Sequence, residues 1–354
     1  MRQPAAAVAL AVLLLAPAVQ AQSHPVKSQP ESGTARAVAV EACAEGQRLL
    51  ERRTSADIVA ALQRFERAIA TDATYAPAFA GLAETRALLY DYLGAKEAAQ
   101  QALALDDGLA PPHAVLAFAR MHQDWDWAGS EAEFRRALEL DPGRASTHLW
   151  HAILLEVTGR ADEAVAEARR AVELAPDQAN VRAGLGYRLF WAGRYDEAVK
   201  ELEAALRMDP GLSTAWYFIG RSRVQQERFP PARLAFDRAR GISPKDANLY
   251  SAQGYLDARA GKRDAAWKVL KELEHRAAAD MPVASQIAAL YTALGDKAAA
   301  LDWLKRSYLA HEGAIVWLKV DPRFESLRGE PGFTEILRKM GFAPSAGESD
   351  ASSS

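Results

Sequence analysis

A step of 34 residues recurs along this chain, and it constrains the fold more than any other feature. Pro142, Pro176, Pro210 and Pro244 are each 34 residues apart, so each marks the same place in a repeated unit. Repeats of about 20 to 50 residues are typical of solenoids, in which each unit packs on its neighbours. Glycines lie on multiples of the same step, and two series of alanines keep it, one of them with one extra residue before Ala137: Gly159, Gly193, Gly261 and Gly295; Ala164, Ala198, Ala232, Ala266 and Ala300; Ala68, Ala102, Ala137, Ala171, Ala205 and Ala239.

Each unit is predicted to be two antiparallel α-helices joined by a short turn. The glycines stand where the first helix must end, because glycine readily takes the left-handed conformation that closes many helices. The prolines stop the second helix, because proline has no amide hydrogen and restricts the residue before it. Small residues are expected to face one another where the two helices cross: Gly186 with Ala198, Gly220 with Ala232, and Gly254 with Ala266.

This 34-residue pattern resembles the tetratricopeptide repeat. The resemblance implies an all-α, right-handed superhelical solenoid of about eight helical hairpins, closed by a C-terminal helical cap. The first hairpin is irregular, with an insertion around Arg52 to Ser55 and Ala73 where later repeats have proline. The expected hairpins are residues 41–75, 76–109, 110–144, 145–178, 179–212, 213–246, 247–280 and 281–314.

Two stretches narrow the resemblance to bacterial tetratricopeptide regions that are often fused behind winged-helix regulators, adenylate cyclases or serine/threonine kinases. One is DWDWAG at residues 124–129, where Asp126 is expected to cap a helix and the tryptophans to pack. The other is the ending that starts with VDPRF at residues 320–324, where Asp-Pro and a later Glu-Pro are expected to start short helices that cover the last hairpin. A signal and a tether are expected ahead of the repeats in place of those domains, so their signalling roles do not transfer.

Both ends of the chain are expected to lie outside the solenoid. Arg2, an apolar run from Ala5 to Ala16 and small residues up to Ala21 form the pattern of a secretory signal cut after Ala21. That run is shorter than the roughly 20 residues that span a membrane, so we expect a periplasmic or secreted protein without a membrane span in the mature chain. Cys43, the single cysteine, is expected to be buried without an internal disulfide. The expected parts are a signal peptide at 1–21, a flexible tether at 22–40, a solenoid at 41–315, capping helices at 316–343 and a disordered tail at 344–354.

The sequence carries no complete motif for catalysis, a cofactor or a metal. His311-Glu312 begins like a zinc-peptidase motif but lacks the second histidine, and Gly184-Leu185-Gly186 lacks the third glycine of a dinucleotide loop. His148 and His151 share a helical face, but no third ligand follows at a metal spacing. We therefore predict no enzyme, no cofactor and no metal ion, and the net charge of −3 gives no sign of nucleic-acid binding.

The first helices of stacked hairpins are expected to line a concave groove. In register, the groove positions are rich in tyrosine and arginine, which often carry the binding energy of interfaces, so an extended or helical peptide is the expected ligand. An alternative is that some of these rings pack within their own repeats. The lysine and asparagine pattern of carboxylate-clamp repeats is missing. The predicted groove residues are Phe118, Met121, Ile153, Tyr187, Phe190, Tyr217, Arg221, Tyr255 and Arg259.

These observations predict an extracytoplasmic scaffold or adaptor that holds a protein or peptide partner in the groove. A second interpretation is an assembly or regulatory subunit of an envelope complex that uses the convex face or the ends of the solenoid. A metal-binding or enzymatic protein is a further alternative. Neither the partner nor the oligomeric state follows from the sequence.

Overall fold

The computed structural model describes residues 32–52, 55–279 and 281–342, and every regular element in these ranges is a helix. The predicted signal peptide and the predicted tail lie outside the described residues. The elements are α1 (Ser32–Arg52), α2 (Ser55–Thr71), α3 (Ala76–Leu88), α4 (Tyr92–Leu105), α5 (Ala110–Ala119), η1 (Arg120–Asp124), α6 (Trp127–Leu140), α7 (Ala145–Val157), α8 (Ala161–Leu174), α9 (Ala179–Trp191), α10 (Tyr195–Met208), α11 (Ser213–Gln225), α12 (Phe229–Ile242), α13 (Ala247–Arg259), α14 (Arg263–Ala278), α15 (Ala284–Leu294), α16 (Lys297–Leu309), η2 (Gly313–Trp317), η3 (Pro322–Leu327) and α17 (Pro331–Lys339).

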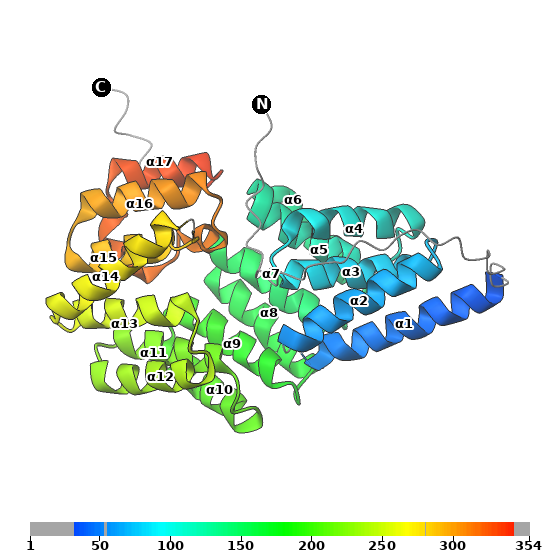
Figure 1. The fold of residues 1–354 in the computed structure, drawn as a ribbon, viewed down its shortest axis with the longest axis horizontal. Helices are drawn as coiled ribbons and strands as arrows, with labels where there is room; N and C mark the ends of the chain where they lie inside the picture. Colours follow the sequence, from blue (N-terminus) through cyan, green and yellow to red (C-terminus); the bar gives the residue numbers. More distant parts are fainter. Residues whose placement is uncertain (1–31, 53–54, 280, 343–354) are drawn as a thin grey trace, which may run out of the picture.

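Consecutive helices pair as hairpins, from α1 with α2 to α15 with α16, and each hairpin packs on the next (Figure 1). This confirms the predicted all-α array of stacked hairpins. The first helices also pack on one another in order, α5 on α7, α7 on α9, α9 on α11 and α11 on α13. They form a continuous layer, whose surface we call the inner face.

The boundary predicted for the N-terminal tether is wrong. α1 begins at Ser32, so residues 32–40 are helical. Ala39 is fully buried and packs in one core with Ala42 and Cys43, which gives this end of the helix tertiary support. Cys43 is buried as predicted, and burial raises the pKa of its thiol to about 11.

The turn inside each hairpin from α3–α4 to α15–α16 places one residue in the left-handed region. Gly159, Gly193, Gly261 and Gly295 have φ between +74° and +93°, as their spacing predicts. The same place is taken by Tyr90, Trp125 and Glu227 in other hairpins, with φ of 64°, 51° and 58°. A side chain costs about 1–2 kcal/mol in this conformation, so each of these exceptions is a position where that cost is offset or tolerated.

Glycines in the first helices let a bulky side chain of the second helix approach, which differs from the small-on-small contact predicted. A Cβ on Gly220 would lie 2.4 Å from the ring of Phe236, and one on Gly254 would lie 2.6 Å from Val269. Gly186 does approach the backbone of Ala198, but its nearest neighbour is the Leu202 side chain. The glycines therefore receive large apolar groups that fill the core between helices.

The C-terminal elements cover the last hairpin, as predicted for a cap. Asp321 accepts a hydrogen bond from the Arg323 amide at 3.0 Å and so starts η3, and Phe324, Leu327 and Phe333 are buried in the core with α15 and α16. Within the described ranges, no helix combines the length and apolar character needed to cross a membrane.

Candidate functional site

A C-terminal segment crosses the inner face of the solenoid. We call residues 313–323, which comprise η2 and the chain up to Arg323, the strap. Val316 of the strap is fully buried in one core with Met121 of η1 and Leu154 of α7. The indole of Trp317 stacks on that of Trp191 in α9, with ring centroids 6.1 Å apart. Segments far apart in sequence are thereby joined across the interior.

Polar groups of the strap meet the end of α7. The indole nitrogen Nε1 of Trp317 donates to Oε1 of Glu156 at 2.5 Å. The ammonium of Lys319 donates to the carbonyl oxygen of Thr158 at 2.9 Å. That carbonyl lies at the C-terminal end of α7, where free carbonyl groups favour a cation.

Glu156 is a buried carboxylate held between two helices and the strap. Only 2% of it is exposed, and it forms an ion pair with Arg188 of α9, which is also buried. Burial raises the pKa of Glu156 to about 7, although Arg188 and Trp317 favour its charged form. The group can therefore gain or lose a proton near neutral pH.

A second buried ion pair joins the strap to α11. Asp321 accepts from Nη2 of Arg221 at 3.0 Å and from Nη2 of Arg323 at 2.6 Å. Burial alone would raise the pKa of Asp321, but Arg323 and Arg221 hold it below its usual range. The Arg221 guanidinium also lies over the rings of Phe190 and Trp191, at 4.5 and 4.8 Å from their centroids.

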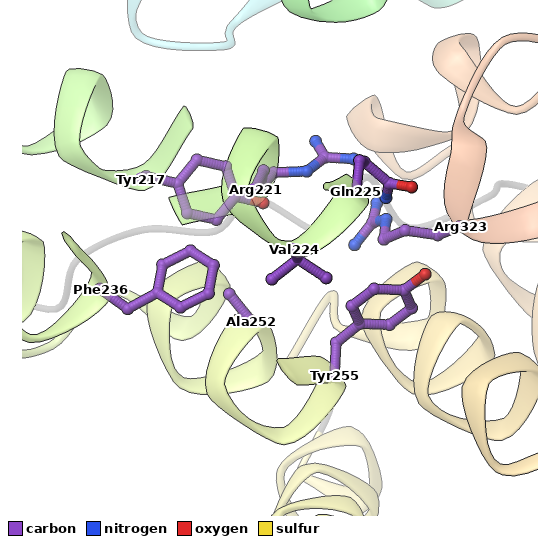
Figure 2. A pocket seen from close by; sticks show the side chains of 8 residues that line it. All are labelled: Tyr217, Arg221, Val224, Gln225, Phe236, Ala252, Tyr255 and Arg323. Carbon is purple, nitrogen blue, oxygen red and sulfur yellow. The ribbon is translucent and has the colours of Figure 1, made fainter. Parts of the chain in front are cut away.

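The strap fills the part of the inner face formed by α11 and α13. Arg323 reaches from the strap towards Tyr255, while Tyr217 and Phe236 lie at the other end of the same pocket (Figure 2). The cavity left among these side chains is about 10 Å³, which is room for about one water molecule. No peptide enters here while the strap is in place.

An open cavity of about 210 Å³ lies beside the strap, between α7 and α9. Trp150, Ile153 and Tyr187 give it apolar walls, and Gln178 and Asn180 bring two side-chain amides to its rim. Among the described residues neither amide has a hydrogen-bond partner, whereas Trp150 is fixed by stacking on Phe118 at 4.9 Å. Arg188 also lines the cavity, so the open site and the strap share the Glu156–Arg188 pair.

The structure divides the predicted groove residues into three sets. Ile153 and Tyr187 line the open cavity, and Phe118 supports its Trp150 wall. Tyr217, Arg221 and Tyr255 line the small pocket closed by Arg323, and Arg259 donates to the Tyr255 hydroxyl at 3.4 Å. Met121 and Phe190 are 0% and 1% exposed. These two predictions are wrong, because both side chains belong to the core and face no groove.

Sequence reasoning missed the residues that give the site its character. Trp150 carries no signal in the register, because its place in the repeat holds Gly184, Phe218 and Ala252 in later hairpins. Asn180 shares its place with Asn248, so a polar position is visible in the register, although the predicted groove residues do not include it. Glu156 and Arg188 look like ordinary helix charges until the strap covers them. The VDPRF stretch is predicted only as a cap, whereas its Asp321 contacts Arg221 across 100 residues of sequence.

The histidines named in the sequence pack and pair inside the array: ring nitrogens of His151 lie 3.5 Å from Glu131 and 3.6 Å from Glu167, and His311 stacks on Trp125. His148 bonds Glu167 through Nδ1 at 2.5 Å and the Pro142 carbonyl through Nε2 at 3.0 Å. The Glu167 hydrogen bond raises the pKa of His148. In the part of the chain that the structure describes, no three His, Cys, Asp or Glu side chains are grouped to hold a metal ion.

Residues 126–179 and 184–247 match the family model of the tetratricopeptide repeat. They run from the cap of α6 to the first residue of α13, so the chain contains tetratricopeptide repeats. A search of curated proteins finds no match. The narrower resemblance to the kinase- and cyclase-associated group stays a prediction.

Solved structures with a similar fold include human IFIT1, as a dimer with PPP-AAAA, at 16% identity over 76% of this chain and 72% of that chain, with a TM-score of 0.56. PilF of Pseudomonas aeruginosa is 21% identical over 56% of this chain and 90% of that chain, with a TM-score of 0.45. TTC0263 of Thermus thermophilus, a tetratricopeptide-repeat protein, is 21% identical over 52% of this chain and 99% of that chain, with a TM-score of 0.45. The likeness to IFIT1 supports the fold.

Proposed function

We propose that this tetratricopeptide-repeat chain is an extracytoplasmic, non-catalytic scaffold that binds an extended segment of a protein partner in the open cavity between α7 and α9. The supporting observation is the pairing of apolar walls with the amides of Gln178 and Asn180, which have no partner among the described residues. A carboxamide offers a donor and an acceptor together, which matches the N–H and C=O of a peptide backbone. Trp150 and Tyr187 supply the wall for an apolar side chain of that segment.

The charges around the cavity favour a peptide over a nucleic acid. IFIT1 was solved with PPP-AAAA, whereas three arginines of the inner face of this chain are each engaged by a side-chain carboxyl group. Each pairs with an acidic side chain from another element: Arg182 with Glu201, Arg188 with Glu156, and Arg221 with Asp321. Phosphate binding relies on free Arg and Lys, so the partner is an uncharged or mixed-charge polypeptide segment.

The extracytoplasmic part of the proposal rests on the signal pattern of residues 1–21. It is tested by intact-mass measurement of the protein purified from the cells that produce it. The expected mature chain begins at Gln22. A chain that retains Arg2 and stays with the cytoplasmic fraction would refute this part and leave the binding site untouched.

Site-specific crosslinking tests the binding site. A photo-crosslinking amino acid in place of Asn180 is expected to capture one discrete partner in intact cells, and Trp150→Ala in the same chain is expected to reduce the yield at least about fivefold, as for the loss of an aromatic anchor. The matched control is the same crosslinker at Arg169, an exposed position on α8. A product from Arg169 but none from Asn180 would move the function to the convex side, as in an assembly subunit of a larger complex.

A further inference from the structure

The strap shows which chemistry the inner face accepts. Its deepest polar contacts are an indole N–H on the Glu156 carboxylate and a carboxylate on the Arg221 guanidinium. These groups come from Trp317 and Asp321, which lie four residues apart at the two ends of the link between two short 3-10 helices. The two groups that bind them, Glu156 and Arg221, belong to separate hairpins, on α7 and α11. The surface therefore selects for the distance between the two strap groups as well as for their chemistry.

The strap is held by three buried apolar side chains, Ile315, Val316 and Leu318, and by buried polar contacts. Removing two charges from water costs about as much as a buried ion pair returns, so Asp321–Arg221 adds little net stability for its size. A segment that offers the same polar groups, with apolar side chains in the places of Ile315, Val316 and Leu318, satisfies the same contacts as the strap.

The open cavity gives such a segment a place to begin. Arg188 lines the cavity and also pairs with Glu156, the acceptor of the Trp317 indole. A polypeptide seated on Trp150 and Tyr187 therefore ends beside the place that Trp317 occupies. The site already open and the site covered by the strap are continuous through one ion pair.

We infer that the strap is an intramolecular ligand of the inner face, and that the partner segment replaces it with a tryptophan and, four residues later, a carboxylate. This rests on the proposed function and specifies its partner. The tryptophan takes the place of Trp317 on Glu156, and the carboxylate takes the place of Asp321 on Arg221. The strap then limits binding to segments that compete with it.

The test uses the full mature chain and, as probe, a fluorescent synthetic peptide with the sequence of residues 313–324. Fluorescence anisotropy is expected to show at least about tenfold tighter binding to an Asp321→Asn chain than to the unmodified chain, because the weakened strap competes less well. A peptide carrying Ala for Trp317 and Asn for Asp321 is expected to lose that affinity. Arg221→Gln added to the Asp321→Asn chain is expected to abolish the gain.

Two further variants separate strap release from loss of folding. Lys319→Ala removes the hydrogen bond to the Thr158 carbonyl, and it is expected to raise peptide affinity in the same direction with unchanged helix content. Glu325→Gln, at an exposed carboxylate just beyond the strap, is the matched control and is expected to leave peptide affinity unchanged. Equal affinity for the unmodified, Asp321→Asn and Lys319→Ala chains, all with native helix content, overturns the inference.

The two proposals fail separately. If the peptide ignores the state of the strap while crosslinking from Asn180 persists, the cavity binds a partner of other chemistry and only the strap inference is wrong. If crosslinking from Asn180 fails while the peptide still distinguishes the variants, the inner face binds the strap sequence without serving the proposed partner.

Discussion

Trp317 donates its indole N–H to Glu156 at 2.5 Å across 161 residues of sequence. A tetratricopeptide array ordinarily has contacts only between neighbouring hairpins. Here a residue of the C-terminal strap reaches the fourth hairpin, and Trp127 of the third hairpin donates to the Met340 carbonyl at 2.8 Å. The two ends of the array from the third hairpin onward are therefore tied together.

Titration of Glu156 is expected to make the fold less stable as pH rises towards neutrality. Its pKa is raised from 4.5 to about 7 in the folded chain, so between these values the folded chain holds a proton that the unfolded chain has lost. The free energy of unfolding therefore falls as pH increases through this window, by up to about 1.4 kcal/mol per pH unit. Glu156→Gln is expected to remove this contribution, because an amide does not titrate in this range. The amide oxygen can still accept the hydrogen bond from Trp317, so the contact itself is retained.

Urea unfolding from about pH 4 to 8, which brackets both pKa values, measures the effect as the difference in slope between the two proteins. Glu203→Gln, at an exposed carboxylate on α10, is the control and should retain the slope of the unmodified chain. Parallel curves for the unmodified and Glu156→Gln proteins would show that Glu156 does not titrate in this range.

Trp127→Phe is expected to lower the free energy of unfolding by about 1 kcal/mol more than the smaller buried ring area alone would, because a hydrogen bond is lost. The phenyl ring can still stack on Phe342, which lies 4.5 Å from the indole, but it leaves the Met340 carbonyl without its donor. The control is Trp303→Phe, because the Trp303 indole N–H has no hydrogen-bond partner among the described residues. Equal losses for the two variants, measured by urea unfolding, would argue against a contribution from the hydrogen bond.

Gly220→Ala is expected to destabilise the chain by about 1–3 kcal/mol, since the new methyl group would meet the Phe236 ring at 2.4 Å. Gly241→Ala, on the exposed side of α12 with nothing within 4 Å, should instead stabilise by about 0.5–1 kcal/mol. Thermal and urea unfolding report both changes. If Gly220→Ala stabilised the chain, the close contact between Gly220 on α11 and Phe236 on α12 would not limit the stability of the fold.

Glycine at the two turn positions 227 and 125 is expected to act with opposite sign. Glu227→Gly relieves a left-handed side chain and loses only a surface pair with Arg259, so it should stabilise by about 0.5–1 kcal/mol. Trp125→Gly relieves the same backbone cost but loses stacking on His311, 4.3 Å away at an interplanar angle of 4°. It should therefore destabilise by about 2 kcal/mol. Effects of the same sign, in urea unfolding, would contradict this account.

The repeated part of the fold could be predicted because successive hairpins use the same residue types to end their helices. The turn glycines such as Gly193, and the stops at Pro142 and Pro176, fix helix ends by backbone conformation alone, so the hairpin boundaries follow from spacing. Trp125 illustrates the limit. It occupies a glycine position, and the reason lies in His311, which no local pattern connects to it.

The candidate site was only partly predictable for the same reason. Register placed Tyr187 and Arg221 on the inner face, but it could not show that Arg221 is already neutralised by Asp321. That pairing depends on the path of the strap after the last repeat, where periodicity ends. Met121 of η1 is likewise buried in one core with Val316, which belongs to the strap and so lies beyond the last repeat.

The bond between Trp317 and Glu156 also fixes the length of the array. Open solenoids tolerate the gain or loss of a unit, because each unit meets only its neighbours. Here one additional hairpin between α8 and α15 would carry Trp317 past Glu156 and Asp321 past Arg221, and one fewer would leave both short. The number of repeats is therefore fixed from the third hairpin onward, where Trp127 bonds Met340, and changes of length are accommodated only before it.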